Sequence, residues 1–85
     1  MKAYRGEFIK KDGSVRQMNF VKLQDIGQFN SEFLSDRIGG AGESREYPDG
    51  QELVFDLIAD NFRIFNHSTL VTEIEEYEID DSLFI

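Results

Sequence analysis

Hydrophobic residues are densest between residues 52 and 66, a stretch that also contains a reversal of the chain. Residues 53–58 and 62–65 are two short apolar runs, and residues 59–61 between them, Ala-Asp-Asn, tolerate the left-handed backbone that a tight turn needs. In the first run both faces are largely apolar, with Asp56 as the exception, which is typical of a strand inside a sheet or a small barrel. The pattern predicts a β-hairpin in the core of the fold.

A second hairpin is predicted at the start of the chain. Residues 3–10 and 15–23 show the alternation of side chains that strands show when their two faces have different environments. Between them, Asp12-Gly13 is a strong hairpin signal, because both central residues of a type I′ turn need positive φ. We expect two antiparallel strands joined by such a turn.

The hydrophobic period changes to that of a helix over residues 25–38. Asp25 suits the N-cap position, with Gln28 where a capping box places Glu or Gln, and Gly39 follows the expected last turn. The spacing predicts one α-helix, inserted between the second and third strands, with its apolar stripe on the sheet. The stripe comprises Ile26, Phe29, Phe33, Leu34 and Ile38.

Glycine and proline dominate the connection that follows this helix. We expect residues 39–44 to be a linker and residues 47–50, Tyr-Pro-Asp-Gly, to be a turn with proline where φ is preset and glycine where φ is positive. A phosphate-binding loop is the alternative that a glycine-rich segment raises. We reject it, because such a loop follows a strand and opens a helix behind a Lys-Ser/Thr pair, whereas this one closes a helix.

The last part of the chain fits two patterns. Residues 66–70 are polar enough for a helical turn or a tight corner. Residues 71–79 alternate as a strand would, but their apolar side chains also fit one face of a helix. We favour a strand, because β-branched and aromatic residues recur and because a barrel needs a strand that covers the edge of the first one. That pairing would place glutamates beside Lys2, Arg5 and Lys10.

Together these elements predict a mainly β (α+β) fold: a small SH3-like or Sm-like barrel of about five antiparallel strands, with one helix between strands 2 and 3. The 85 residues allow one domain, 1–85, near the low end of what folds alone. With no Cys to form disulfides or thiolate metal sites, eight Phe and three Tyr must hold the core. No apolar run is long enough for a membrane span and no signal peptide is recognised, so we expect a soluble cytoplasmic protein.

Charge is unevenly distributed along the chain. Residues 1–22 carry a net charge of +4 and residues 23–85 a net charge of −12, which together give the formal −8. From residue 71 onward there are six acidic residues and no basic one. Such polarity indicates either a partner or merely a basic neighbour within the fold, and we favour a partner protein with a basic surface. The candidates for this interaction are Glu73, Glu75, Glu76 and Glu78.

Three other charged residues are candidates for a ligand-binding site: Arg16, Asp56 and Arg63. Asp56 lies inside an otherwise apolar run, where an unpaired carboxylate is costly, so we expect it near the rim of the fold or paired with Arg63 or Arg16. Such a pair has two interpretations. It stabilises the fold as an ion pair, or one of the arginines presents its guanidinium to a phosphate or carboxylate.

Catalytic and metal chemistry find little support in the sequence. His67 is the only His, so any catalytic triad would depend on it, and its neighbours Ser68 and Thr69 are adjacent in sequence only. We interpret His67 as a surface corner residue. A zinc site lacks ligands, and the acidic tail lacks the spacing of a calcium loop. We expect no enzyme activity, no cofactor and no metal.

Three segments together resemble a known family. They are residues 13–20 (GSVRQMNF), 54–57 (VFDL) and 62–66 (FRIFN), with Thr69-Leu70 beyond the last. The chain resembles the small WYL-like proteins of tailed bacteriophages. The resemblance implies a stand-alone Sm-like barrel, and the larger WYL domains bind ligands or nucleic acid within bacterial regulators. This chain has no Trp and no Trp-Tyr-Leu triplet, so the matched polar positions are Arg16, Asp56 and Arg63.

We therefore expect a non-enzymatic interaction module: a phage accessory protein that binds a bacterial host protein, in the host cytoplasm, through its acidic face. The alternative is a module for a ligand or for single-stranded nucleic acid, which would use Arg16, Arg63 and the aromatic residues of the basic first hairpin. The net charge of −8 disfavours a polyanion. Exposed strand edges or residues 83–85 could also mediate a homodimer.

Overall fold

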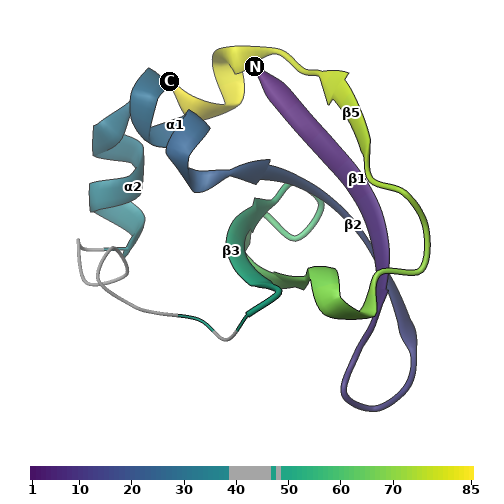
Figure 1. Ribbon diagram of the computed structural model, residues 1–85. Helices are drawn as coiled ribbons and strands as arrows, with labels where there is room; N and C mark the ends of the chain where they lie inside the picture. Colours follow the sequence, from purple (N-terminus) through teal and green to yellow (C-terminus); the bar gives the residue numbers. More distant parts are fainter. Residues whose placement is uncertain (39–46, 48) are drawn as a thin grey trace.

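One antiparallel β-sheet organises the fold (Figure 1). The computed structural model describes residues 1–38, 47 and 49–85. Within these ranges, five strands pair in the order β4-β3-β2-β1-β5, and two short helices accompany them, so the predicted mainly β (α+β) class is confirmed. The elements are β1 (Lys2–Ile9), β2 (Val15–Lys22), α1 (Leu23–Phe29), α2 (Ser31–Ile38), β3 (Gln51–Asp56), β4 (Asn61–Asn66), β5 (Glu75–Glu78) and the 3-10 turns η2 (His67–Thr69) and η3 (Asp81–Phe84).

Two hydrophobic clusters lie on opposite faces of the sheet. Because side chains alternate along a strand, Phe20 and Val21 in β2 enter different clusters, as do Val54 and Phe55 in β3. Both faces of the central strands are therefore apolar, as the pattern of the central run predicts. The strand cluster consists of Phe8, Met18, Phe20, Val54 and Phe65, and the helix cluster of Ala3, Val21, Ile26, Phe33, Phe55 and Phe84.

β1 and β2 form the first predicted hairpin, but its loop is not a type I′ turn. Lys10 N–H donates to the carbonyl of Ser14 at 2.8 Å, and within this loop only Gly13 has positive φ, at 87°. Asp12 Oδ1 accepts from the N–H of Ser14 at 3.0 Å and from its hydroxyl at 2.6 Å. A side chain thus supplies the acceptor that shapes the loop, and only one residue needs the left-handed conformation.

β3 and β4 form the predicted central hairpin, and Asp60 in its turn has the expected left-handed backbone, with φ of 54°. The first strand of the hairpin ends earlier than predicted. It stops at Asp56, whose Oδ1 accepts from the N–H groups of Ile58 and Ala59 at 3.0 and 3.1 Å. Ile58 is consequently a turn residue, 78% exposed, and does not belong to the core.

The predicted single helix over residues 25–38 is in fact two helices, α1 and α2, separated by an extended Asn30. α1 begins directly after Lys22, which makes no side-chain cap, so Asp25 lies in the first turn and is not the N-cap. A tertiary contact holds the break, because Asn30 Nδ2 donates to the carbonyl of Phe84 at 2.7 Å. Periodicity in the sequence carries no information about that contact.

The apolar stripe of these helices faces the sheet only in part. Ile26 and Phe33 are buried in the helix cluster, and Leu34 packs against it. Phe29, just before the break, is 45% exposed, since the residues on either side of the break no longer share one helix axis. The side chain of Ile38 lies outside the described residues. A membrane span would need a longer and more apolar helix than any in the described ranges 1–38, 47 and 49–85.

The predicted glycine-rich linker lies outside the described residues, as does Pro48 of the predicted 47–50 turn. Gly50, at the end of that turn, has the expected positive φ, at 84°. Space also requires glycine there, because an added Cβ would overlap the side chain of Ser68. The Gly50 carbonyl accepts from His67 N–H at 2.6 Å, which joins the start of β3 to η2.

After β4 the chain returns to β1 through η2, the predicted helical corner. Leu70 pairs with Phe8, and Val71 N–H donates to the carbonyl of Glu7 at 2.8 Å. The sheet curls around the strand cluster, since Phe8 of β1 and Phe65 of β4 have ring centroids 4.9 Å apart although these two strands are not neighbours in the strand order. The shape is compatible with an SH3-like or Sm-like fold, with β4 and β5 as the two ends of the strand order.

β5 confirms the strand interpretation of the last segment, although it has only four residues. It pairs antiparallel with β1 as far as Arg5↔Glu75, and pairing resumes at Phe8↔Leu70. Between those two pairs, two residues of β1 face the four residues 71–74. The two additional residues form a bulge, which leads the chain away from β1 before β5 begins.

Gly6 lies under this bulge and has no room for a side chain. An added Cβ would stand 2.7 Å from Phe65 Cζ and 3.3 Å from Ile74 Cγ1. We expect Gly6→Ala to lower the free energy of unfolding by about 1–3 kcal/mol, the usual cost of overpacking a core. Equilibrium unfolding in urea measures the loss. Gln17→Ala, at an exposed position of the neighbouring strand, is the control and should stay within about 0.5 kcal/mol of the wild type. Equal stability of the two variants would contradict the tight packing at Gly6.

Candidate functional site

Glutamates line the edge strand β5 and the bulge before it. Glu73, Glu75, Glu76 and Glu78 form the acidic edge, and all four are exposed. The side chains of Glu75 and Glu78 reach 72% and 73% exposure. Because β5 ends the strand order, its outer side has no neighbouring strand among the described residues (Figure 1). The four predicted protein-interaction residues therefore share one accessible edge of the sheet.

Basic residues of β1 partly neutralise the acidic edge, as the predicted pairing implies. Arg5 Nη1 lies 3.7 Å from Glu75 Oε2, and Lys2 Nζ lies 3.8 Å from Glu76 Oε1. The four side chains are between 48% and 72% exposed, and exposed ion pairs contribute little to stability. Lys10 does not join them, because it pairs within its own loop at 3.9 Å. The glutamates are thus held loosely enough to exchange partners.

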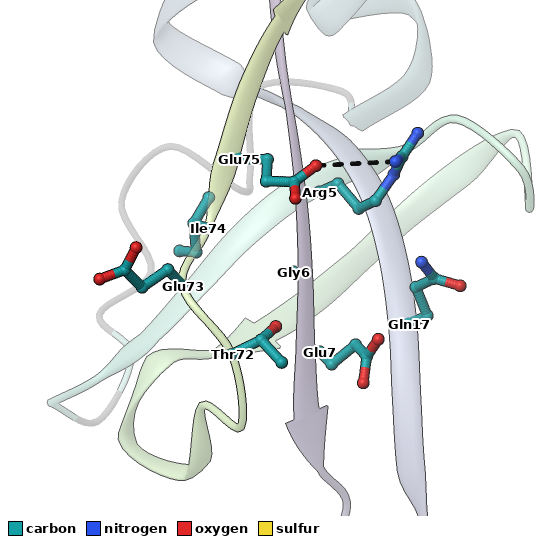
Figure 2. Close-up of a pocket in the computed structure, with 8 residues that line it drawn as sticks. All are labelled: Arg5, Gly6, Glu7, Gln17, Thr72, Glu73, Ile74 and Glu75. Atoms are coloured by element: carbon teal, nitrogen blue, oxygen red, sulfur yellow. Dashed lines mark ion pairs between the residues drawn. The ribbon is translucent and has the colours of Figure 1, made fainter.

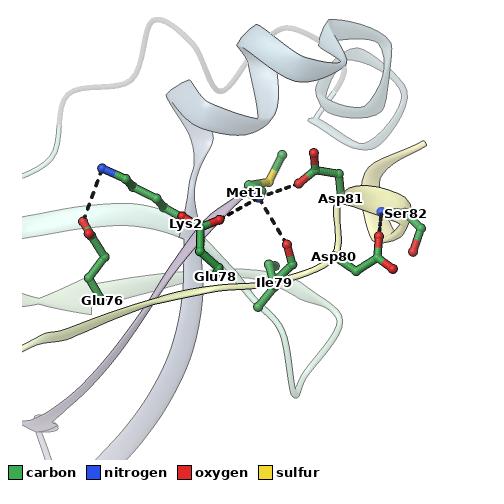
Figure 3. A network of polar contacts seen from close by, with 8 residues as sticks. All are labelled: Met1, Lys2, Glu76, Glu78, Ile79, Asp80, Asp81 and Ser82. Carbon is green, nitrogen blue, oxygen red and sulfur yellow. Dashed lines mark hydrogen bonds and ion pairs between the residues drawn. The ribbon is translucent and has the colours of Figure 1, made fainter.

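The amino group of Met1 organises the other end of β5 (Figure 3). It forms ion pairs with Asp81 Oδ1 at 2.6 Å and with Glu78 Oε2 at 3.2 Å, and it donates to the carbonyl of Ile79 at 3.1 Å. The hydrogen bond to Asp81 is the main cause that raises the pKa of this amine above its usual value, while desolvation opposes the shift. Ile79 N–H donates back to the Met1 carbonyl at 2.9 Å, which keeps β1 and β5 in register.

The bulge before β5 opens a groove of about 540 Å³ beside β1 (Figure 2). Its walls are residues 5–7 of β1, Gln17 of β2 and residues 72–75. Arg5 is already engaged, since its Nε donates to Asn19 Oδ1 at 3.0 Å and its guanidinium pairs with Glu75. Among the described residues, neither Glu7 nor Glu73 has an ion-pair partner. Three carboxylates against one guanidinium make the groove favourable to a cation.

The three predicted ligand-binding residues are not brought together. Arg63 Nε lies 3.7 Å from Asp56 Oδ2, across the neighbouring strands β4 and β3. Arg16 lies elsewhere, because it pairs with Phe8 near the far end of β2, whereas Asp56 pairs with Phe20. These two positions on β2 are separated by roughly 13 Å, the length of four strand residues. Asp56 therefore takes Arg63, and not Arg16, as its partner.

Asp56 makes shorter contacts with the backbone of its own turn than with Arg63. The residue is 7% exposed, while the side chain of Arg63 is 42% exposed. The 3.7 Å distance to Arg63 exceeds hydrogen-bonding range, whereas the N–H groups of Ile58 and Ala59 both donate to Asp56 at 3.0 and 3.1 Å. The geometry favours the structural interpretation of the pair over a ligand site.

His67 belongs to a polar cluster that hydrophobic periodicity alone does not predict. Its Nε2 lies 2.9 Å from Glu52 Oε1, and Glu52 Oε2 lies 4.0 Å from Lys22 Nζ. Lys22 Nζ also stands over the ring of Tyr4, 5.4 Å from the centroid. The register that sets Lys22 opposite Val54 brings Lys22 close to Glu52, and the sequence pattern does not specify this register. The cluster links β1, β2, β3 and η2, so His67 is half-buried and not a free surface residue.

The hydroxyls next to His67 have other partners. Ser68 Oγ donates to the carbonyl of Asp49 at 3.3 Å, and Thr69 Oγ1 donates to the carbonyl of Ile9 at 2.8 Å. The imidazole and these hydroxyls are therefore not arranged as a base and its nucleophile. Within the ranges that the structure describes, no group of three His, Cys, Asp or Glu side chains is placed to hold a metal ion.

The aromatic residues of the basic hairpin do not form an open stacking platform for bases. Phe8 and Phe20 are 5% and 0% exposed, and Tyr4 stacks on Phe20 with ring centroids 5.5 Å apart. Base stacking requires an accessible ring face. A nucleic-acid interface on this hairpin would depend on Arg16 and the other charged side chains.

The turn contacts of Asp56 predict unequal costs for losing the two members of its ion pair. Asp56→Ala leaves two turn N–H groups without their acceptor, so we expect the free energy of unfolding to fall by about 1–3 kcal/mol. Arg63→Ala removes a long ion pair in which the arginine side chain is 42% exposed, and it leaves the turn hydrogen bonds of Asp56 in place, so it should cost less than about 1 kcal/mol. Asp56→Asn keeps an acceptor oxygen and is the control. Urea unfolding of the three variants measures these losses. Equal losses for Asp56→Ala and Arg63→Ala would mean that the ion pair contributes more to stability than the turn hydrogen bonds do, which would contradict the prediction.

Asp12 and Asp80 link stability to pH. The hydroxyl and N–H of Ser14 lower the pKa of Asp12, and the N–H of Ser82 lowers the pKa of Asp80 (Figure 3). A carboxyl whose folded pKa is lowered stabilises the fold above its unfolded pKa, and this contribution disappears as pH falls through the folded value. We expect stability in urea to drop between about pH 5 and pH 2, and to drop less in the double variant Asp12→Asn/Asp80→Asn. An unchanged pH dependence in that variant would contradict the two hydrogen-bonded turns.

A comparison of the chain with protein-family models, with curated proteins and with solved structures gives no match. The acidic edge, the groove beside it and their charges are therefore the basis on which a function is assigned.

Proposed function

We propose that this chain is a non-enzymatic interaction module that binds a partner protein through the acidic edge. The observation that carries the proposal is that Glu73, Glu75, Glu76 and Glu78 are all exposed on one edge of the sheet. A basic surface of the partner would meet these carboxylates. The charge of the whole chain acts in the same direction, because a net −8 attracts a cationic surface and speeds the encounter.

Loosely held ion pairs make the acidic edge suitable for reversible binding. Arg5 and Lys2 lie 3.7 and 3.8 Å from their glutamates, so an arginine of a partner could gain a closer, hydrogen-bonded contact. Little stability is lost when such exposed pairs open. The sheet behind the glutamates limits the freedom of their backbone, which reduces the entropy lost on binding. The edge is in this sense prepared for a cationic partner.

The resemblance to WYL-like phage proteins supplies the biological part of the proposal. A phage accessory protein acts in the cytoplasm of its bacterial host, so the partner would be a host protein with a basic surface. Carboxylates arranged along a strand could occupy a groove that such a protein otherwise offers to nucleic acid. Nucleic-acid-binding proteins of the host are therefore the class that we expect to recover.

Charge reversal on β5 tests this function. Glu75→Lys/Glu78→Lys should abolish recovery of the host protein when the tagged chain is used for affinity purification from a bacterial lysate, because two carboxylates become cations. The matched control is Glu32→Lys/Asp36→Lys, which changes the net charge equally on the exposed side of α2. Binding to the purified partner should also weaken as salt is added. Thermal unfolding of each variant first establishes that it is folded.

The control separates the acidic edge from net charge. Equal losses in the two double variants would mean that overall charge, and not the acidic edge, attracts the partner. Undiminished recovery by Glu75→Lys/Glu78→Lys contradicts the proposal. Affinity for a single-stranded oligonucleotide that disappears in Arg16→Ala would support the nucleic-acid alternative instead.

A further inference from the structure

We infer that the partner contributes a basic, extended segment that adds to the outer side of β5 as a sixth strand of the sheet. This inference rests on the proposed function and specifies the form of the partner. In strand addition, main-chain hydrogen bonds provide affinity and alternating side chains provide specificity. Three features of β5 point to it: the direction of its backbone groups, the sign of its side chains and the groove beside it.

Backbone groups at alternate residues of β5 point away from β1. Met1 and Ile79 exchange two hydrogen bonds, from Met1 N to Ile79 O at 3.1 Å and from Ile79 N to Met1 O at 2.9 Å. In an antiparallel ladder such pairs alternate with pairs whose N–H and C=O groups face outward. Following the register from Ile79, Glu78 and Glu76 are the residues whose backbone groups face outward.

These outward groups are accessible. β5 is the last strand in the sheet order, and both Glu76 and Glu78 are exposed. Figure 1 shows β5 at the margin of the fold, with no described element beyond it. Outward N–H and C=O groups on an edge strand are a template for another strand. Two such residues offer up to about four hydrogen bonds, which suits a short segment and a reversible complex.

The side chains of β5 select a basic segment. Glu76 and Glu78 project from the face of the sheet that carries Lys2, and Glu75 projects from the opposite face. An added strand with Lys or Arg at successive positions therefore meets a carboxylate on either face. A second copy of β5 would instead place glutamates opposite glutamates, which is destabilising. The acidic edge thus disfavours pairing with itself and favours a cationic strand.

The groove beside the bulge offers a place for one cationic side chain of the added segment. Arg5, Glu7 and Glu75 lie on the same face, because Arg5 pairs with Glu75 and Glu7 is two residues further along β1 (Figure 2). Glu75 is shared with Arg5 at 3.7 Å, and Glu7 has no ion-pair partner among the described residues. A lysine or arginine that enters here would balance the charge of the groove. Edge and groove together favour a segment whose basic residues lie next to one another.

Amide hydrogen exchange locates the added strand. The probe is a blocked eight-residue peptide, Lys-Lys-Val-Val repeated twice, titrated into the wild-type chain at low salt. On binding, the amide hydrogens of Glu76 and Glu78 should exchange more slowly, by up to about tenfold, because they become hydrogen-bonded. Those of Glu75 and Tyr77 already face β1 in the register and should change little. Protection at alternate residues is a signature that binding through side chains alone does not produce.

A backbone-modified peptide is the matched control. Methylation of two successive central amide nitrogens keeps the charge and removes hydrogen-bond donors on either edge of the peptide. Affinity should fall by about tenfold or more, the effect of one or two lost backbone hydrogen bonds. In the protein, Glu76→Pro should bind more weakly than Glu76→Ala, because both lack the carboxylate but only proline lacks the outward N–H. If Glu76→Pro does not fold, the methylated peptide still tests the same bonds.

The outcomes distinguish this inference from the proposed function. Selective protection of Glu76 and Glu78, with affinity lost on methylation, supports strand addition. Equal binding of the two peptides without protection of Glu76 and Glu78 overturns strand addition. A host partner that binds while neither peptide binds also overturns strand addition. In both cases the proposed interaction through the acidic side chains still stands. Protection of the same amides by self-association of the chain also overturns it. If neither peptide binds and Glu75→Lys/Glu78→Lys retains the host partner, both proposals fail.

Discussion

Adjacent residues of the two central strands enter different hydrophobic clusters, and this constraint determines much of the remaining structure. Phe20 and Val21 of β2, and Val54 and Phe55 of β3, are at most 4% exposed. A sheet that is buried on both faces at its centre must be covered twice, by its own curl around the strand cluster and by α1, α2 and η3 on the helix cluster. A chain of this size has little further material with which to cover its edges. β5 is such an edge, and three of its four residues are glutamates.

The curl of the sheet also explains why a groove accompanies the acidic edge. The chain must reach β1 twice, first where Leu70 meets Phe8 after the corner η2 and then where β5 begins. The two extra residues between these contacts let Ile74 pack against the strand cluster while Thr72 and Glu73 remain exposed. Gly6 makes this possible, since a side chain there would meet both Ile74 and Phe65. Packing beneath the bulge therefore decides which carboxylates are presented above it.

Local pattern predicted those parts of the fold that neighbours in sequence determine: both hairpins, the helical region, the corner at η2 and a final strand beside β1. It failed where a distant or unexpected side chain intervenes. The helix breaks at Asn30, which donates to Phe84, 54 residues away, and β3 ends early because the carboxylate of Asp56 accepts from its own turn. The acidic residues of the candidate site could be named in advance, since exposure follows from a run of glutamates. The groove and the cluster around Glu52 could not be predicted, because both depend on the register between strands, which the sequence pattern does not specify to within one residue.

The glutamates of β5 act both on the neighbouring strand β1 and on any strand that approaches the outer side of β5. Toward β1, Lys2 and Arg5 lie near the glutamates, and Arg5 also lies over the ring of Tyr77 at 5.5 Å. The four-residue strand itself is held by its backbone pairing with β1, which the two hydrogen bonds between Met1 and Ile79 continue. Away from β1, the same glutamates repel any edge of like charge, which protects an otherwise open strand from pairing with its own copies. This repulsion acts only on a strand that carries negative charge. A cationic strand would experience attraction where a second copy would experience repulsion, so the residues that disfavour self-pairing also set the chemistry of the partner that we propose.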